Sequence, residues 1–183
     1  MKNIFKVNCK FKLIPLIISL AIPLIASFLL SIVTRDSMKI YGELNLPTFY
    51  PPGWVFGVVW PILYVLMGIA AYRIYMIKKY ENKSNGSLVL YFIQLTLNLI
   101  WPIIFFYLKL YGIAWIELAI LILVLIVTVI KFLKLDKISG MLMIPYILWC
   151  FFALYLNISI WMLNEMQGLE VSFSSKTVYN NTL

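Results

Sequence analysis

Long apolar segments separated by short polar or charged connectors dominate this chain. A bilayer core of about 30 Å requires roughly 20 apolar residues in a helix. Five segments meet this requirement, over 13–33, about 54–77, 88–108, about 113–130 and about 138–163. The pattern therefore predicts an all-α membrane protein, a bundle of five transmembrane helices that forms one domain over 13–164.

The two ends of the chain differ from this apolar pattern. Residues 1–12 carry four lysines, so this stretch and the first apolar segment have two interpretations, a cleaved signal peptide or a retained helix. The apolar stretch is longer than a typical signal core and no A-x-A site follows it, which favours a retained helix behind a basic cytoplasmic N-terminus. Residues 165–183 are polar without helical periodicity, which predicts a flexible tail.

Composition supports lipid as the main solvent of the chain. Hydrophobic residues make up 63% and charged residues 12%, against about 45–50% and about 25% in soluble domains. The absence of histidine excludes Ser-His-Asp triads, His₃ zinc sites and histidine-ligated haem. Cys9 and Cys150 are too far apart in sequence to suggest a disulfide framework or a metal site, so we expect no metal and no cofactor.

The distribution of basic residues predicts an orientation. With the N-terminus inside, four of the 15 Lys and Arg residues fall in outer segments, and these are Arg35, Lys39, Lys109 and Lys176. The positive-inside rule then places the loop 34–53 and the C-terminus outside. The basic residues flank the spans and form no continuous patch, so the net charge of +8 indicates contact with anionic lipid and no nucleic-acid partner. The frequent use of Lys, Ile and Asn favours a bacterial plasma membrane as the location.

Segment 41–68 combines a stiff loop with a stripe of aromatic residues. Pro51 and Pro52 lack N–H groups and suit a rigid loop that leads into a helix start. Trp60 and Tyr64 then follow four residues apart, on one helical face. An aromatic stripe beneath a rigid loop is suited to a flat, apolar ligand.

Polar and aromatic residues inside the other spans add candidates. The side-chain amides of Gln94, Asn98 and Asn157 are costly in hydrocarbon unless they are bonded, so they either join helices or contact a ligand directly. Glu117 is a functional candidate because it is an intramembrane carboxylate, but its place one turn into a span favours an interfacial role. Trp60 and Trp149 each begin a helical face that continues with small or polar residues, which favours a pocket in front of each indole and leaves ordinary packing as the alternative.

Three sequence blocks resemble the TspO/MBR family of tryptophan-rich sensory proteins, translocator proteins and peripheral-type benzodiazepine receptors. Segment 41–68 is similar to the family loop W-Y-x-x-L-x-K-P-x-W-x-P-P and the helix W-x-x-L-Y-x-x-M-G. Segment 94–106 is similar to Q-x-x-L-N…W-P…F-F, and segment 145–157 to P-Y-x-x-W-x-x-F-A-x-x-L-N. The resemblance covers nearly all of 13–164.

The resemblance implies a five-helix bundle whose inner cavity is closed by the first loop, as a lid. It implies that this cavity binds tetrapyrroles such as protoporphyrin IX and other lipophilic small molecules, including isoquinoline carboxamides. The pocket residues carried over are Phe56, Trp60, Tyr64, Asn98, Trp149, Ala153 and Leu156. The propionates of a porphyrin would meet cations at the outer rim, where Arg35 and Lys39 are available. A metal-free porphyrin, as ligand and not as cofactor, fits a chain without histidine better than haem does.

Departures from the family pattern bear on these expectations. Ile40 and Phe49 replace two loop tryptophans and Leu46 replaces a loop lysine, which weakens capture of a porphyrin by the lid. Ile158 and Met162 stand where the cholesterol pattern of the last span has Tyr and Arg. A homodimer is implied by analogy alone, because the third span has no small-x-x-x-small pair.

Three functions remain open at this point. The first is a membrane receptor, carrier or sensor for porphyrins. The second, also implied by the resemblance, is an enzyme that degrades porphyrin with light and oxygen, in which Trp60 and Trp149 would carry the radical chemistry. The third is an unrelated small transporter or assembly protein, and a transporter is disfavoured because Glu117 is the only acid in the middle of a span.

Overall fold

The computed structural model describes residues 4–7, 10–81 and 86–166. Cys9 and the tail from residue 167 onward, which includes Lys176, lie outside these described residues, so the predictions made for them are not addressed by the structure. Within them, five helices are long and apolar enough to cross a membrane, which confirms the predicted all-α bundle. They are α1 (Leu13–Val33), α3 (Trp54–Glu81), α4 (Ser87–Pro102), α5 (Tyr111–Leu135) and α6 (Lys137–Trp161).

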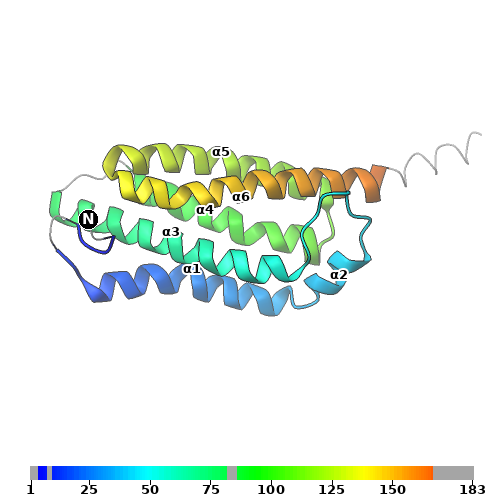
Figure 1. Cartoon of the computed structure of the whole chain (residues 1–183), viewed down its shortest axis with the longest axis horizontal. Helices are drawn as coiled ribbons and strands as arrows, with labels where there is room; N and C mark the ends of the chain where they lie inside the picture. Colours follow the sequence, from blue (N-terminus) through cyan, green and yellow to red (C-terminus); the bar gives the residue numbers. More distant parts are fainter. Residues whose placement is uncertain (1–3, 8–9, 82–85, 167–183) are drawn as a thin grey trace, which may run out of the picture.

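The five helices lie side by side as long rods, with the N-terminal segment at one end and a short helix at the other (Figure 1). Single π-helical turns, η1 (Ile103–Tyr107) and η2 (Met162–Met166), extend α4 and α6. We call the end formed by residues 4–12, 73–81 and 131–139 the basic end. The opposite end, formed by residues 34–53, 107–111 and 161–166, is the lid end.

Two helices are longer than their apolar segments predicted. Helix α3 continues to Glu81 and α5 to Leu135, so both include lysines at the basic end. Lysine stems pack along apolar surface while the ammonium groups reach outward. Cations are also favourable in the last turn of a helix, where the backbone carbonyls lack partners. The lysines therefore end the apolar sequence pattern, but α3 and α5 continue through them as helices.

The connector between α1 and α3 contains a short helix that the sequence did not predict. Helix α2 (Ser37–Glu43) lies within the predicted loop 34–53. Seven residues are too few to form a stable helix alone, so tertiary packing must hold this one. Its Tyr41 is buried and packs edge-on against Phe56 at the start of α3, with ring centroids 5.4 Å apart.

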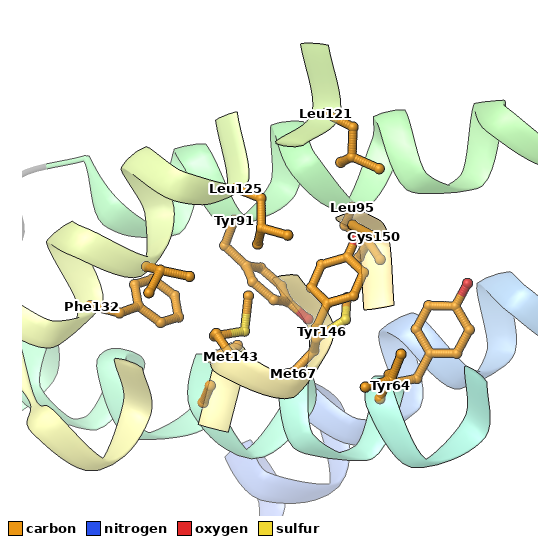
Figure 2. Packing of buried hydrophobic residues seen from close by; sticks show 14 of the residues in the cluster. Tyr64, Met67, Tyr91, Leu95, Leu121, Leu125, Phe132, Met143, Tyr146 and Cys150 are labelled. Atoms are coloured by element: carbon orange, nitrogen blue, oxygen red, sulfur yellow. The ribbon is translucent and has the colours of Figure 1, made fainter. Parts of the chain in front are cut away.

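The helices meet around an apolar core drawn from α3, α4, α5 and α6 (Figure 2). In this view the rings of Tyr91 and Tyr146 lie among Met67, Leu125 and Met143. Helix α1 packs on α3 at Gly68, where an added Cβ would lie 2.8 Å from the carbonyl oxygen of Ser19. The close contact of these two helices therefore depends on the absence of a side chain at Gly68.

A buried ion pair fastens the basic end. Arg73, which is only 4% exposed, donates from Nε to Oδ2 of Asp136 at 2.6 Å and from Nη2 to Oδ1 at 3.0 Å. Asp136 caps α6 by accepting from the Ser139 backbone N–H at 2.9 Å. This two-point geometry joins the end of α3 to the start of α6. The sequence interpretation took Arg73 for one more flanking charge and missed this role.

The N-terminal segment is held against the same ion pair. Nη1 of Arg73 donates to the carbonyl oxygens of Ile4 at 2.7 Å and Lys6 at 3.1 Å. The hydroxyl of Tyr72 donates to the carbonyl of Phe5 and accepts from the backbone N–H of Lys12. These bonds keep the segment before α1 packed across the basic end of the bundle.

Candidate functional site

A continuous set of aromatic rings runs from the lid end into the bundle. Trp60 stacks on Tyr64 with ring centroids 5.7 Å apart, and lies edge-on to Tyr146 at 6.3 Å and to Trp149 at 6.5 Å. The ring of Phe56 contacts Trp149, with centroids 5.8 Å apart, and also contacts Tyr41 of α2. We call this set the aromatic cluster. It consists of Tyr41, Phe56, Trp60, Tyr64, Tyr146 and Trp149.

Helical spacing explains how the cluster forms. Phe56, Trp60 and Tyr64 recur every four residues along α3 and so share one face. Tyr146 and Trp149 are three residues apart on α6 and share the face turned toward them. Four of the predicted pocket residues are therefore brought together, as the sequence suggested. Tyr146 was not predicted, although its spacing from Trp149 would have indicated it.

The buried amides form bonds between helices. The hydroxyl of Tyr64 donates to Oδ1 of Asn98 at 2.8 Å, which ties α3 to α4. Asn157 accepts from Nε1 of Trp101 at 3.0 Å and donates to the carbonyl of Tyr111 at 3.2 Å. These bonds confirm the interhelical interpretation for Asn98 and Asn157. Direct contact between Asn98 and a ligand stays a prediction.

Several buried polar atoms have no hydrogen-bond partner among the described residues. They include both amide atoms of Gln94, both carboxyl oxygens of Glu117, the hydroxyl of Tyr146 and Nε1 of Trp149. Most buried polar groups in proteins are bonded, so each such atom needs an explanation. The side chain of Glu117 is partly buried, with both carboxyl oxygens shielded, and its interfacial role stays a prediction. Trp149 and Tyr146 present unbonded donors within the aromatic cluster itself.

Ala153 and Leu156 are both buried, but they occupy different surroundings. Ala153 packs in the main core with Tyr64 and Tyr146. Leu156 belongs to a second cluster at the lid end with Tyr41 and others, namely Phe105, Tyr111, Ala114 and Ile160. The predicted pocket residues thus divide between the aromatic cluster and the packing that surrounds it.

A groove of about 510 Å³ lies between α3 and α6. This volume is within the range of about 300–1,000 Å³ that is usual for small-molecule sites. The residues that line it are Val59, Ile62, Leu63, Leu66, Pro145, Leu148, Trp149 and Phe152. Trp149 is thus common to the groove and to the aromatic cluster. Trp60 touches Trp149 but does not line the groove, so the hollow lies beside Trp149 rather than between the two indoles.

The predicted lid is fastened over the lid end by named bonds. The backbone N–H of Asn45 donates to Oδ1 of Asn164 at 3.0 Å, and Nδ2 of Asn164 donates back to the carbonyl of Asn45 at 3.0 Å. The hydroxyl of Tyr41 donates to the carbonyl of Pro51 at 3.2 Å. Burial, with a smaller contribution from Tyr50, raises the pKa of Tyr41 to about 12, so this donor keeps its proton at neutral pH.

The two predicted propionate contacts lie on the surface of the lid end. Arg35 is exposed and lies 3.8 Å from the carboxylate of Asp36. Lys39 is exposed on α2. Within the described part of the chain, neither side chain forms a hydrogen bond or an ion pair with the aromatic cluster. Contact with a ligand at this rim stays a prediction.

Comparison with known proteins identifies the family. A sequence model described as the TspO/MBR family matches residues 19–162. The chain belongs to the TspO/MBR family. This match covers all of α3 to α6 and includes the aromatic cluster and the groove.

Relatives in this family come from all three domains of life. Tryptophan-rich protein TspO of Chlorobaculum tepidum is 35% identical over 124 residues, which cover 68% of this chain and 78% of the relative. TspO of Archaeoglobus fulgidus is 33% identical over 153 residues, which cover 83% of this chain and 98% of the relative. The human translocator protein is 32% identical over 130 residues, which cover 70% of this chain and 77% of the relative.

The TspO/MBR motif residues have separate structural roles in this chain. In the block that begins at Trp60, the indole and Tyr64 belong to the aromatic cluster, while Leu63 and Met67 fill the core. Gly68 ends the block at the close contact with α1. The motif therefore combines a candidate binding surface with the packing that holds it in position.

Proposed function

We propose that this chain is a membrane receptor, carrier or sensor that binds metal-free porphyrins such as protoporphyrin IX, and other flat hydrophobic molecules. The observation that carries the proposal is the aromatic cluster beside a groove of about 510 Å³ lined by apolar side chains and one indole. Offset and edge-on contacts between aromatic rings contribute about 0.5–1.5 kcal/mol each beyond the area they bury. The names of relatives, which include a sensory protein and translocator proteins, agree with such a role.

Binding would use the rings and the unbonded donors together. The plate of a porphyrin would lie against the rings of the aromatic cluster, where Nε1 of Trp149 is buried without a partner among the described residues. Trp60 and Phe56, which both contact that indole, would offer further ring faces to the ligand. Arg35 and Lys39 would meet the propionates at the lid end.

The test is quenching of tryptophan fluorescence by protoporphyrin IX in detergent. We expect wild-type protein to show saturable quenching in the micromolar range, and the double variant Trp60→Phe, Trp149→Phe to lose it. The matched control is Trp115→Phe, Trp161→Phe, which removes two indoles that contact each other at 5.8 Å outside the cluster. An unchanged titration of the cluster variant would contradict the proposed site.

A second candidate function is degradation of porphyrin by light and oxygen. It is favoured by one observation, the unbroken contacts that join Trp60 to Tyr64, Tyr146 and Trp149, all oxidisable rings. Illumination of the complex, with porphyrin absorbance as the readout, decides between binding and degradation. Bleaching no faster than that of free porphyrin in the same detergent leaves binding as the function.

We also propose the orientation indicated by the charge distribution. The basic end faces the cytoplasm of a bacterial cell and the lid end faces outward, so that the C-terminus lies outside. Lysines of α3 and α5 at the basic end, Lys78, Lys79 and Lys134, support this orientation. An alkaline phosphatase fused to the C-terminus is then active, whereas the same enzyme fused between α3 and α4 is inactive.

A further inference from the structure

The groove between α3 and α6 opens toward lipid rather than toward water. Ile62 and Leu148 on its two walls are 55% and 63% exposed. Ile62 follows Trp54 by eight residues, and Pro145 follows Lys137 by eight, which places both about 12 Å from a helix end. In a bilayer core of about 30 Å this is close to the middle. A molecule in the groove therefore comes from the hydrocarbon.

Trp149 is the partition between this groove and the aromatic cluster. Its ring lies at 90° to Trp60 and at 69° to Phe56, with Phe152 of the groove 5.5 Å away on its own helix. Its Nε1 has no hydrogen-bond partner among the described residues, so no polar bond holds the indole in place. Among the residues that line the groove, Trp149 is the one that also belongs to the aromatic cluster.

Both walls of the groove contain a proline. Pro61 precedes Ile62 in α3, and Pro145 itself lines the groove in α6. A proline inside a helix cannot donate to the carbonyl four residues earlier, which weakens the helix locally. The two helices are therefore easier to bend at the groove than elsewhere along their length.

At both ends of the bundle, the described residues are held together by several contacts. At the lid end, Asn45 and Asn164 exchange two hydrogen bonds, and Phe49 packs edge-on against Phe152 at 5.9 Å. At the basic end, Arg73 and Asp136 form a buried ion pair beneath the N-terminal segment. Passage through either end would require several of these contacts to break.

We infer that the groove is the entrance by which a flat, apolar ring ligand passes from the bilayer to the aromatic cluster, with Trp149 as the side chain that moves. This inference rests on the proposed function, because it needs a ligand that binds the cluster. The occupant is the ring ligand itself, since a wall that includes an indole and continues into further rings matches a planar aromatic better than a flexible acyl chain.

The test measures association rates of protoporphyrin IX with protein in lipid nanodiscs, by stopped-flow porphyrin fluorescence. The variant Ile62→Phe, Leu148→Phe fills the groove from two exposed positions and leaves the core untouched. The control Ile120→Phe, Leu123→Phe makes the same type of change on the exposed face of α5. We expect the groove variant to associate about tenfold more slowly, a typical span for association rates among variants of one site, and the control to match wild type.

Equilibrium measurements on the same samples separate the entrance from the site. An entrance slows association and dissociation together, so the equilibrium quenching of the groove variant stays near that of wild type. Unchanged association in the groove variant, with quenching retained, overturns the inference and leaves the proposed function standing. Weakened equilibrium binding at an unchanged association rate also overturns it. If protoporphyrin IX does not quench the tryptophan fluorescence of wild type, the proposed function itself is contradicted.

A second variant tests the competing route through the lid. Asn164→Ala removes the two bonds that Asn45 and Asn164 exchange. If ligand enters from the bilayer, loosening the lid leaves the association rate unchanged. An acceleration of about tenfold in this variant, comparable to the slowing predicted for the groove, would place the entrance under the lid and contradict the inference.

Discussion

At the scale of single residues, the site depends on side chains that serve two structures at once. Trp149 belongs to the aromatic cluster and to the groove. Tyr64 stacks on Trp60 and also donates a buried hydrogen bond to Asn98. Arg73 was hidden from sequence reasoning, because its partner Asp136 is 63 residues away and nothing local marks the pair as buried. The aromatic spacing on α3, in contrast, was readable because helical periodicity is local.

Tyr64→Phe tests whether the bond to Asn98 supports the site. The substitution keeps the ring and leaves a buried acceptor without its donor, so we expect a loss of about 1 kcal/mol in the free energy of unfolding. Chemical unfolding in detergent measures it. The control Tyr107→Phe removes a hydroxyl from an exposed ring. Equal stability of the two variants would show that the Tyr64 bond contributes nothing.

Asp136→Asn tests the ion pair at the basic end. Burial alone would raise the pKa of Asp136, but hydrogen bonds from Arg73 and Ser139 hold it below the ordinary 3.8. A carboxyl with a lowered folded pKa stabilises the fold above its unfolded pKa and loses this contribution as the pH falls through the folded pKa. We therefore expect the variant to be less stable at pH 7 by about 3 kcal/mol, the low end for breaking a buried pair.

The lowered pKa of Asp136 also predicts how the stability difference between wild type and Asp136→Asn depends on pH. As the pH falls below the ordinary aspartate pKa of about 3.9, the unfolded state takes up a proton before the folded carboxylate does, so the stability difference between wild type and Asp136→Asn shrinks. Thermal unfolding between pH 7 and pH 3 measures this trend. The matched control is Asp36→Asn at a carboxylate whose side chain is 74% exposed. A difference that stays constant over this range would contradict the assignment.

At the scale of elements, apolar length predicted all five long helices, but not the features set by tertiary contact. Helix α2 has too few residues to be predicted from propensity and exists because Tyr41 packs on Phe56. The groove between α3 and α6 could likewise not be predicted from the sequence. Periodicity shows which face Trp149 occupies, whereas the position of α3 relative to α6 decides whether the space beside that face is filled.

Gly68→Ala tests the contact between α1 and α3. The new Cβ would lie 2.8 Å from the Ser19 carbonyl and 3.0 Å from Cα of Leu20, both backbone atoms that move only if the helices separate. Overpacking of this kind costs about 1–3 kcal/mol. Gly57→Ala on the same helix is the control, since no atom lies within 4 Å of its added Cβ. We expect the melting temperature in detergent to fall for Gly68→Ala and to hold or rise for Gly57→Ala.

At the scale of the whole molecule, contacts among the described residues hold both ends of the bundle together, and a groove lies on one side. The lid end is held by Asn45 and Asn164, and the basic end by Arg73 and Asp136. The side opening between α3 and α6 leads to Trp149. This arrangement agrees with the proposed entrance for a ligand that dissolves in the membrane.

The measurement that tests the central claim most directly is the melting temperature with and without protoporphyrin IX. A ligand that binds only the folded state stabilises it by about 2.7 kcal/mol at 100 times its Kd. We predict that the melting temperature of wild type rises with porphyrin concentration, and that of Trp60→Phe, Trp149→Phe does not. A wild-type melting temperature that is unaffected by porphyrin, or a rise of equal size in the variant, would contradict binding at the aromatic cluster.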